Sequence, residues 1–177
     1  YTSHGVLLAT TGERTGRSPN DRFIVKEKGL ADEVWWGQVN RPISVDKFER
    51  LLDKTRKHLN DADNLFVKDA FCGADPAHTM PVRLVTEKAW HAAFMHNMFV
   101  RAPKEDLSKH VPEYTILHAP NLRAVPSQDG TNSGVFVILA LDRGLVIIGG
   151  THYAGEIKKA IFTIMNHILP AKGLLPM

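Results

Sequence analysis

The segment VFVILALDRGLVIIGGTHYAGEI, residues 135–157, carries the clearest structural pattern in this chain. Two apolar runs, 135–141 and 145–148, flank Asp142-Arg143-Gly144, and two such runs around a short turn predict a β-hairpin. A glycine-bearing loop follows, and apolar residues then recur at the spacing of an amphipathic helix. These residues are Ile157, Ala160, Ile161, Ile164, Met165 and Ile168. A buried hairpin that leads directly into a helix is typical of an α/β domain.

The segments on the N-terminal side alternate between helical and extended patterns. Helical spacing predicts helices over 44–59, just after Pro42, and around 90–98, ending before Pro103. A turn is expected at 73–76. The predicted strands cover residues 6–9, 23–26, 65–67, 82–85 and 115–118. Because strands and helices are interspersed and some strands form hairpins, we expect an α/β fold, a single domain with a mixed β-sheet flanked by helices.

The composition is that of a globular domain and excludes several classes of protein. The chain has 177 residues, 44% of them apolar and 23% charged. No apolar run approaches the roughly 18 residues that a membrane helix needs, so we expect no membrane partner. The net charge of +3 is small and spread out, which disfavours nucleic-acid binding. The one cysteine, Cys72, excludes an internal disulfide framework and favours a reducing compartment, the cytoplasm.

The first candidate site is the loop between the predicted strands at 6–9 and 23–26. It carries Arg17 close to Gly12 and Gly16 and is rich in hydrogen-bond donors. An arginine presents a planar fork that grips a carboxylate or a phosphate through two parallel hydrogen bonds. The alternative is a surface turn whose arginines are merely solvated.

The second candidate site is the strand-to-helix segment 149–159, where a phosphate-binding loop would lie. The Walker pattern requires Gly-Lys-Ser/Thr, but Glu156-Ile157 follows Gly155, so this segment is not expected to bind a nucleotide. Lys158 and Lys159 occupy the first helical turn. The positive end of the helix dipole and their mutual repulsion favour a neutral amine that could act as a ligand or a base. The alternative is that both lysines extend into solvent, with Glu156 offsetting their charge.

The histidines do not form a recognisable motif in the sequence. His91 and His96 are five residues apart, which is not the i, i+4 spacing that puts two ligands on one helix face, and no Cys/His zinc spacing occurs. His152 is suggestive only because it precedes Tyr153.

Four blocks of sequence resemble the N-terminal domain of ATP-dependent phosphoenolpyruvate carboxykinases, in the order and spacing of that family. The blocks are residues 15–19, 35–43, 73–76 and 149–159. Residues 169–177 are similar to the segment with which this domain ends in the family. The sequence departs from the family at Asn20, where a lysine is usual, and at Asn132 and Gly134, which break a Gly-Thr-Arg-Ser pattern. The resemblance implies that 1–177 is the N-terminal substrate-binding domain, truncated at both ends, with the nucleotide-binding C-terminal domain absent.

The resemblance also implies a reaction and roles for four residues. Family members convert oxaloacetate and ATP to phosphoenolpyruvate, carbon dioxide and ADP in gluconeogenesis. By resemblance, Arg17 and Tyr153 bind the substrate carboxylate or the departing carbon dioxide, and Lys159 is a neutral amine that ligates Mn²⁺. Lys158 adds positive field near the phosphates, and ATP with Mg²⁺ is bound mainly by the missing C-terminal domain. The alternative is a stand-alone, non-catalytic domain that binds dicarboxylate anions.

Overall fold

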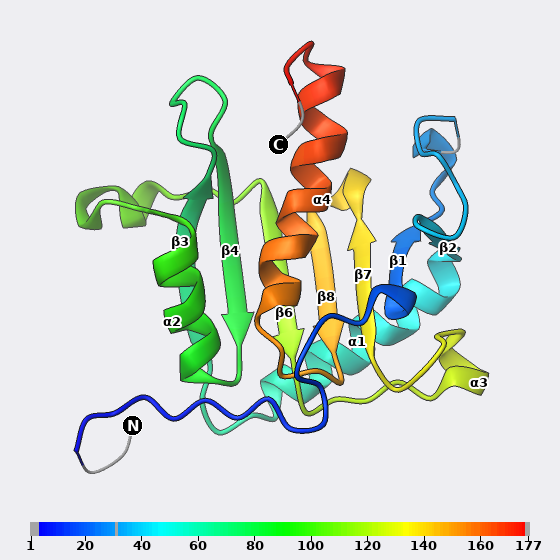
Figure 1. The fold of residues 1–177 in the computed structure, drawn as a ribbon, viewed down its shortest axis with the longest axis horizontal. Coiled ribbons are helices and arrows are strands. Elements are labelled where there is room, and N and C mark those ends of the chain that lie inside the picture. The colour runs from blue at the N-terminus through cyan, green and yellow to red at the C-terminus, as the bar shows by residue number, and fades with distance from the viewer. Residues whose placement is uncertain (1–3, 31, 176–177) are drawn as a thin grey trace.

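The computed structural model describes residues 4–30 and 32–175 and shows one mixed β-sheet with helices on both faces (Figure 1). The 8-stranded sheet has the order β2-β1-β7-β8-β6-β4-β3-β5. Its strands are β1 Arg22–Val25, β2 Arg41–Ile43, β3 Phe66–Cys72, β4 Met80–Thr86, β5 Val100–Arg101, β6 Tyr114–Ala119, β7 Phe136–Ala140 and β8 Leu145–Gly149. The α-helices are α1 Val45–Asn60, α2 Ala89–Met98, α3 Pro126–Asp129 and α4 Gly155–Ala171.

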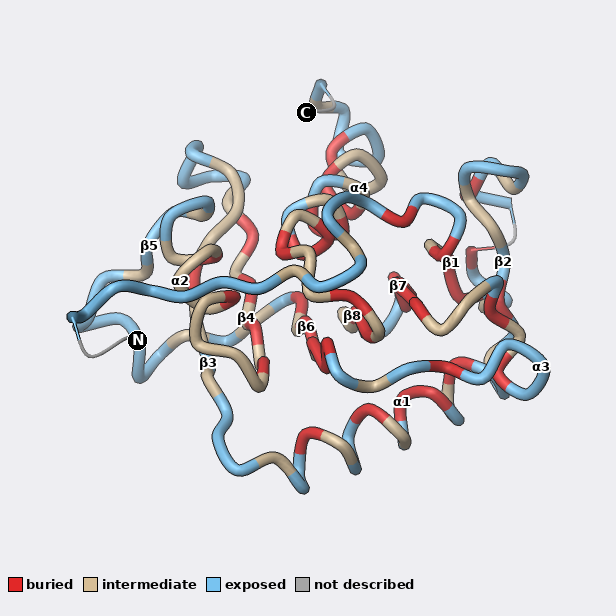
Figure 2. The backbone as a smooth tube through the Cα atoms, turned by 60° about the horizontal axis from the view of Figure 1, so that its bottom comes forward, coloured by how far each residue is buried: buried red, intermediate tan, exposed pale blue. Residues whose placement is uncertain are grey.

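The central strands are buried on both faces, and their side chains divide between two cores. Along β7, Phe136 and Ile138 belong to the core that α1 closes with Phe48. Val137 and Leu139 belong to the opposite core, which receives the apolar face of α4. This division follows from the two-residue period of a strand. Buried residues accordingly run along the middle strands and the inner sides of the helices (Figure 2).

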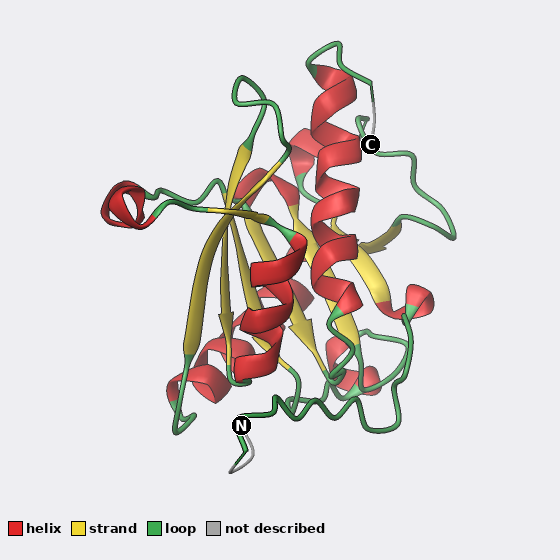
Figure 3. Ribbon diagram, turned by 60° about the vertical axis from the view of Figure 1, so that its left-hand side comes forward, coloured by secondary structure: helices red, strands yellow, loops and turns green. Residues whose placement is uncertain are grey.

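The direction of the strands sets the position of the site. Strands β4, β6 and β8 are parallel neighbours, so their carboxyl ends reach the same edge of the sheet. Helix α4 begins at this edge, after the short loop 150–154 that follows β8, and the N-terminal segment crosses it (Figure 1). Helices α2 and α4 then run over the same face of the sheet (Figure 3). Ligands of α/β sheets commonly bind outside the carboxyl ends of the strands.

The α/β fold with a mixed sheet is confirmed, and so are the hairpin and the three long helices. Strands β7 and β8 pair antiparallel, with Leu139 opposite Val146, and Gly144 ends the turn at φ 58°. The turn expected at 73–76 lies between antiparallel strands β3 and β4. No helix in the described residues is long and apolar enough to cross a membrane.

The strand predicted at 6–9 is wrong, and two short strands were missed. Val6 and Leu8 lie in an irregular segment and are 60% and 70% exposed. An apolar run forms a strand only where a neighbouring strand is available to pair with its backbone, and this segment lies outside the sheet. Strands β2 and β5 are too short to show a two-residue period, and the strand predicted at 65–67 is the beginning of the longer β3.

Candidate functional site

The structure brings Arg17, Tyr153, Lys158 and Lys159 together around one cavity of about 240 Å³. Three of them come from the start of α4 and the residues just before it, whereas Arg17 comes from the N-terminal segment. The remaining lining residues are Thr11, Trp90, Phe94, Ala154 and Gly155. The two loops singled out in the sequence therefore form a single site at the amino end of α4.

The Arg17 loop is fastened to α4 by a hydrogen bond between distant parts of the sequence. The backbone N–H of Ser18 donates to Oε1 of Glu156 at 2.6 Å, and both residues are buried. A short 3-10 helix, Pro19–Asp21, follows, and the Asp21 carboxylate accepts a hydrogen bond from Ser133 Oγ at 2.9 Å. These bonds fix the backbone on the C-terminal side of Arg17 and leave its side chain exposed toward the cavity.

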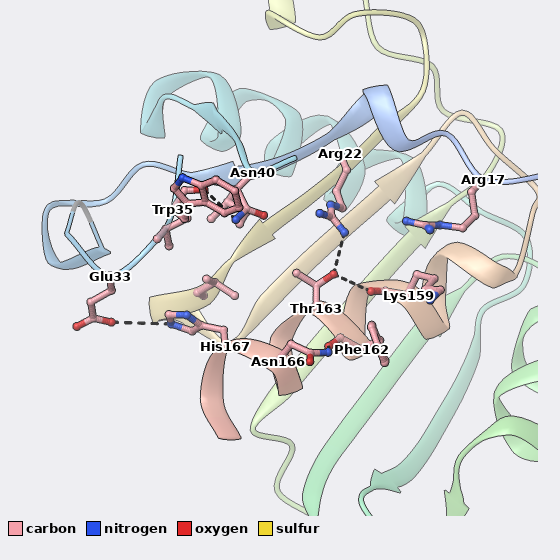
Figure 4. A pocket seen from close by; sticks show the side chains of 13 residues that line it. Arg17, Arg22, Glu33, Trp35, Asn40, Lys159, Phe162, Thr163, Asn166 and His167 are labelled. Carbon is pink, nitrogen blue, oxygen red and sulfur yellow. Dashed lines mark hydrogen bonds and ion pairs between the residues drawn. The ribbon is translucent and has the colours of Figure 1, made fainter. Parts of the chain in front are cut away.

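A second cavity, of about 400 Å³, adjoins the first and shares Arg17 and Lys159 with it (Figure 4). Arg22 also lines it and donates to Thr163 Oγ1 at 2.9 Å and to the Val39 carbonyl at 3.2 Å. Burial, and then the charge of Arg17, lower the pKa of Arg22. Three cationic side chains thus converge on connected space, which suits an anionic ligand.

The two helix-terminal lysines have different surroundings. Lys159 is half-buried, and its Nζ lies 4.3 Å from the centroid of the Phe162 ring, a cation–π contact. Lys158 is exposed and also lines an apolar cavity of about 270 Å³ beside Cys72. Burial raises the pKa of the Cys72 thiol, which disfavours a reactive thiolate. Lys159 therefore does not simply extend from the helix into solvent, whereas Lys158 is exposed at the edge of the apolar cavity.

Tyr153 owes its position to the residues on both sides of it. Its backbone N–H donates to Thr151 Oγ1 at 3.1 Å. A Cβ atom at Gly155 would collide with the Tyr153 ring, so glycine at 155 lets the ring lie against the first turn of α4. Gly150 has φ +70°, and a Cβ there would collide with the Gly134 carbonyl oxygen. Glycine at these positions allows the loop to pass close to its neighbours.

Although the histidines form no motif in the sequence, the fold brings His91, His118 and His152 together. The rings of His91 and His118 are perpendicular, with centroids 4.2 Å apart, and both side chains are buried. Their Nε2 atoms lie 2.8 Å from the His152 carbonyl oxygen and 3.1 Å from the Thr151 carbonyl oxygen, respectively. Helix α2, strand β6 and the loop after β8 are separate in sequence, so spacing along the chain gave no signal.

The lining of the smaller cavity lacks the side chains that most often bind divalent cations. The lining of the smaller cavity includes the Lys159 amine, the Tyr153 phenol and the Thr11 hydroxyl but no carboxylate or imidazole. Across the described residues, no group of three His, Cys, Asp or Glu side chains is placed to hold a metal ion. A divalent cation held by Lys159 would therefore need most of its other ligands from outside the described residues.

Asn20 and Asn132, where departures from the family pattern are expected, contact each other, and neither lines the two cavities that Arg17 and Lys159 share. The Asn132 side-chain amide donates to the Asn20 carbonyl. Arg41 donates to the same carbonyl at 3.0 Å and to Asn20 Oδ1 at 2.9 Å. These two residues therefore belong to a surface network and not to the lining of the site.

Comparison with known proteins finds one family along the whole sequence. The family model described as phosphoenolpyruvate carboxykinase matches residues 1–177. "Phosphoenolpyruvate carboxykinase (ATP) 1" of Moorella thermoacetica is 51% identical over 175 residues, covering 99% of this chain and 33% of the relative. "Phosphoenolpyruvate carboxykinase (ATP)" of Bacillus cereus and that of Bacillus anthracis are each 47% identical over 176 residues, with the same coverage. The chain thus spans about a third of the length of these curated relatives, and it belongs to the ATP-dependent phosphoenolpyruvate carboxykinase family.

Proposed function

We propose that residues 1–177 form the N-terminal substrate-binding domain of an enzyme that converts oxaloacetate and ATP to phosphoenolpyruvate, carbon dioxide and ADP, a gluconeogenic reaction. The observation that carries the proposal is the meeting of Arg17, Tyr153, Lys158 and Lys159 around one cavity. Family membership over the full chain supports it. The free thiol of Cys72 supports a reducing compartment, the cytoplasm.

The chemistry of the site suits a dicarboxylate that loses carbon dioxide. Arg17 can donate two parallel hydrogen bonds to one carboxylate of oxaloacetate, and the Tyr153 phenol can donate another. When the bond to the departing carboxylate carbon breaks, its electron pair forms an enolate. The enolate oxygen then attacks the γ-phosphorus of ATP, and ADP leaves. Cations beside that oxygen lower the barrier because the negative charge develops there.

The metal and the nucleotide enter this proposal only through the residues that this chain supplies. We assign Lys159 as a ligand of the divalent cation, Mn²⁺, which when bound would stabilise the enolate charge. Lys158 contributes positive field beside the phosphates. The remaining ligands and most of the site for ATP and Mg²⁺ would lie in the C-terminal domain, within the two thirds of the relatives that this chain does not cover.

Replacing Arg17 in the full-length protein tests the assignment. Arg17→Gln should lower kcat/KM for oxaloacetate by about 100-fold or more, because the charged fork is lost, while the KM for ATP changes little. Arg14→Gln is the matched control, since Arg14 lies on the same segment but lines a different cavity. An unchanged kcat/KM in Arg17→Gln would remove Arg17 from the site. Arg17-dependent binding of oxaloacetate without any product from ATP would favour the alternative, a non-catalytic dicarboxylate-binding domain.

A further inference from the structure

Two buried histidines hold the backbone that precedes Tyr153. His118, from the middle of the sheet on β6, reaches the Thr151 carbonyl oxygen with Nε2 at 3.1 Å. His91, from the first turns of α2, reaches the His152 carbonyl oxygen with Nε2 at 2.8 Å. Both histidines are 0% exposed, so no water competes for these two carbonyls from the side of the rings.

The acceptors determine where the ring protons lie. A carbonyl oxygen can only accept, so each Nε2 must carry a proton. His118 Nδ1 lies 3.3 Å from the buried hydroxyl of Thr86, which can donate to it when the imidazole is neutral. His91 Nδ1 is buried with no partner, as expected for a bare lone pair. Both rings are therefore neutral Nε2–H tautomers.

Burial supports the neutral state of both rings. It lowers the pKa of His91 to about 4 and places the pKa of His118 well below its usual value. The titratable groups that act on His91 are His152, which lowers its pKa, and Glu87 and Lys88 of the connection between β4 and α2, whose effects on that pKa are opposite in sign. Two imidazolium ions at a centroid distance of 4.2 Å would also repel each other strongly.

The two hydrogen bonds hold the loop backbone that sets the direction of the Tyr153 side chain. They fix consecutive carbonyls, those of Thr151 and His152, and the next backbone N–H, that of Tyr153, donates to Thr151 Oγ1 at 3.1 Å. With this part of the loop fixed, the Tyr153 ring faces Gly155 and the cavity that Arg17 also lines. Neither histidine is among the lining residues of that cavity.

We propose that His91 and His118 are positioning residues, which act through the carbonyls of Thr151 and His152 to hold Tyr153 in place for the substrate carboxylate. The proposal rests on the proposed function for the role of Tyr153. An apolar side chain at either position would fill the space but leave a buried carbonyl without a donor, which is costly. A glutamine would restore a neutral donor at nearly the same reach, and this difference makes the proposal testable.

Paired variants of the full-length protein test the proposal in two ways. They show whether the KM for oxaloacetate changes separately from kcat, and whether a glutamine restores the KM that a leucine raises. His118→Leu and His91→Leu should each raise the KM for oxaloacetate about fivefold to tenfold, the equivalent of one neutral hydrogen bond, with the KM for ATP unchanged. His118→Gln and His91→Gln should return the value to within about threefold. Leu84→Ala, a fully buried core change on neighbouring β4, should lower the melting temperature without this rise in KM.

Two results would overturn the proposal. One is a rise in the KM for oxaloacetate in Leu84→Ala equal to that in His118→Leu, because the cause would then be general loosening of the core. The other result would come from ¹⁵N NMR of histidine-labelled protein. The spectrum is expected to show two Nε2–H tautomers that remain neutral at neutral pH. A charged ring or an Nδ1–H ring at His91 or His118 would contradict the proposal. The NMR measurement needs neither a variant nor activity. An inactive wild-type enzyme with the expected tautomers would therefore refute the proposed function and not the geometry.

Discussion

The Ser18 backbone N–H and Glu156 Oε1 are 2.6 Å apart and buried, and they join the two halves of the site. Glu156 is the acidic residue of the first turn of α4, where the positive end of the helix dipole favours a carboxylate. Its charge also acts on Arg22, which lines the larger cavity. One carboxylate thus fastens the Arg17 loop and offsets part of the positive charge that gathers around the cavities.

Removal of this acceptor should cost stability and loosen Arg17. In Glu156→Ala the Ser18 N–H remains buried without a partner, which should lower the free energy of unfolding by about 1–3 kcal/mol. Glu156→Gln keeps a carbonyl oxygen for the same bond and should cost less. Chemical unfolding of both variants gives the comparison. Equal losses in Glu156→Ala and Glu156→Gln would show that the negative charge, and not the hydrogen bond, matters.

Acid should destabilise the protein before its carboxylates are protonated. Burial lowers the pKa of His91 to about 4 in the folded state, whereas a histidine in the unfolded chain titrates near ~6.5. Between these values the unfolded state binds more protons, so the stability is complete above pH ~6.5 and falls as the pH drops toward ~4, by up to about 3 kcal/mol for His91 alone. His118 adds a loss of the same sign.

Urea unfolding at several pH values in that window measures the effect. His91→Phe should flatten the dependence, since phenylalanine cannot take up a proton. Asp69 provides a contrast, because its hydrogen bond with Arg83 lowers the pKa of the Asp69 carboxyl. The stability that ionised Asp69 contributes is therefore lost only as the pH falls below ~4. A slope that stays the same in His91→Phe would show that His91 is not buried in its neutral form.

Gly150 should tolerate a side chain much less well than Gly12. Both have positive φ, +70° and +62°, but a Cβ at Gly150 would collide with the Gly134 carbonyl oxygen, whereas nothing lies within 4 Å at Gly12. Gly12→Ala should cost about 1 kcal/mol of backbone strain. Gly150→Ala should cost at least about 1 kcal/mol more and should raise the KM for oxaloacetate by displacing the loop before Tyr153. Thermal unfolding of both variants checks the difference, and equal losses would contradict the close approach.

The sequence predicts those elements that carry a long apolar pattern within their own residues. Seven consecutive apolar residues, 135–141, and the helical face that begins at Ile157 are sufficient for β7 and α4. The segment 6–9 is also an apolar run, but no strand lies beside it. Whether a neighbouring strand is present depends on the tertiary structure and cannot be read from the run itself. Strands β2 and β5, with 3 and 2 residues, are defined by their pairing partners and not by a pattern of their own.

The same distinction applies to the candidate site. Arg17 and Lys159 can be singled out from the sequence, yet their spacing along the chain gives no reason for them to meet, and only the resemblance to a family predicted one site. His91 and His118 could not be found from spacing, because their shared role arises from the parallel arrangement of β4, β6 and β8 and the packing of α2 beside them. A buried polar pair of this kind has no local signature.

The amine of Lys159 can bind a metal ion only in its neutral form. A metal ligand must offer a lone pair, so this amine has to lose its proton when the ion binds. Protons compete with the metal ion for this lone pair, so binding becomes weaker as the pH falls. In the structure the Nζ atom lies 4.3 Å from the Phe162 ring, a contact that favours an ammonium ion and that a metal must displace.

We therefore expect Lys159→Met in the full-length protein to weaken Mn²⁺ binding about 10-fold or more and to flatten its dependence on pH. Lys158→Met is the matched control, because Lys158 is exposed and should act only through its field. Phe162→Leu should strengthen Mn²⁺ binding modestly, since it removes the competing contact of roughly 0.5–1 kcal/mol while leaving the amine in place. Manganese titrations of the three variants from acidic to mildly alkaline pH compare them directly. If Lys158→Met weakened the affinity more than Lys159→Met, the ligand would be the neighbouring lysine; if neither changed it, both amines would be surface charges and the metal site would lie wholly outside this chain.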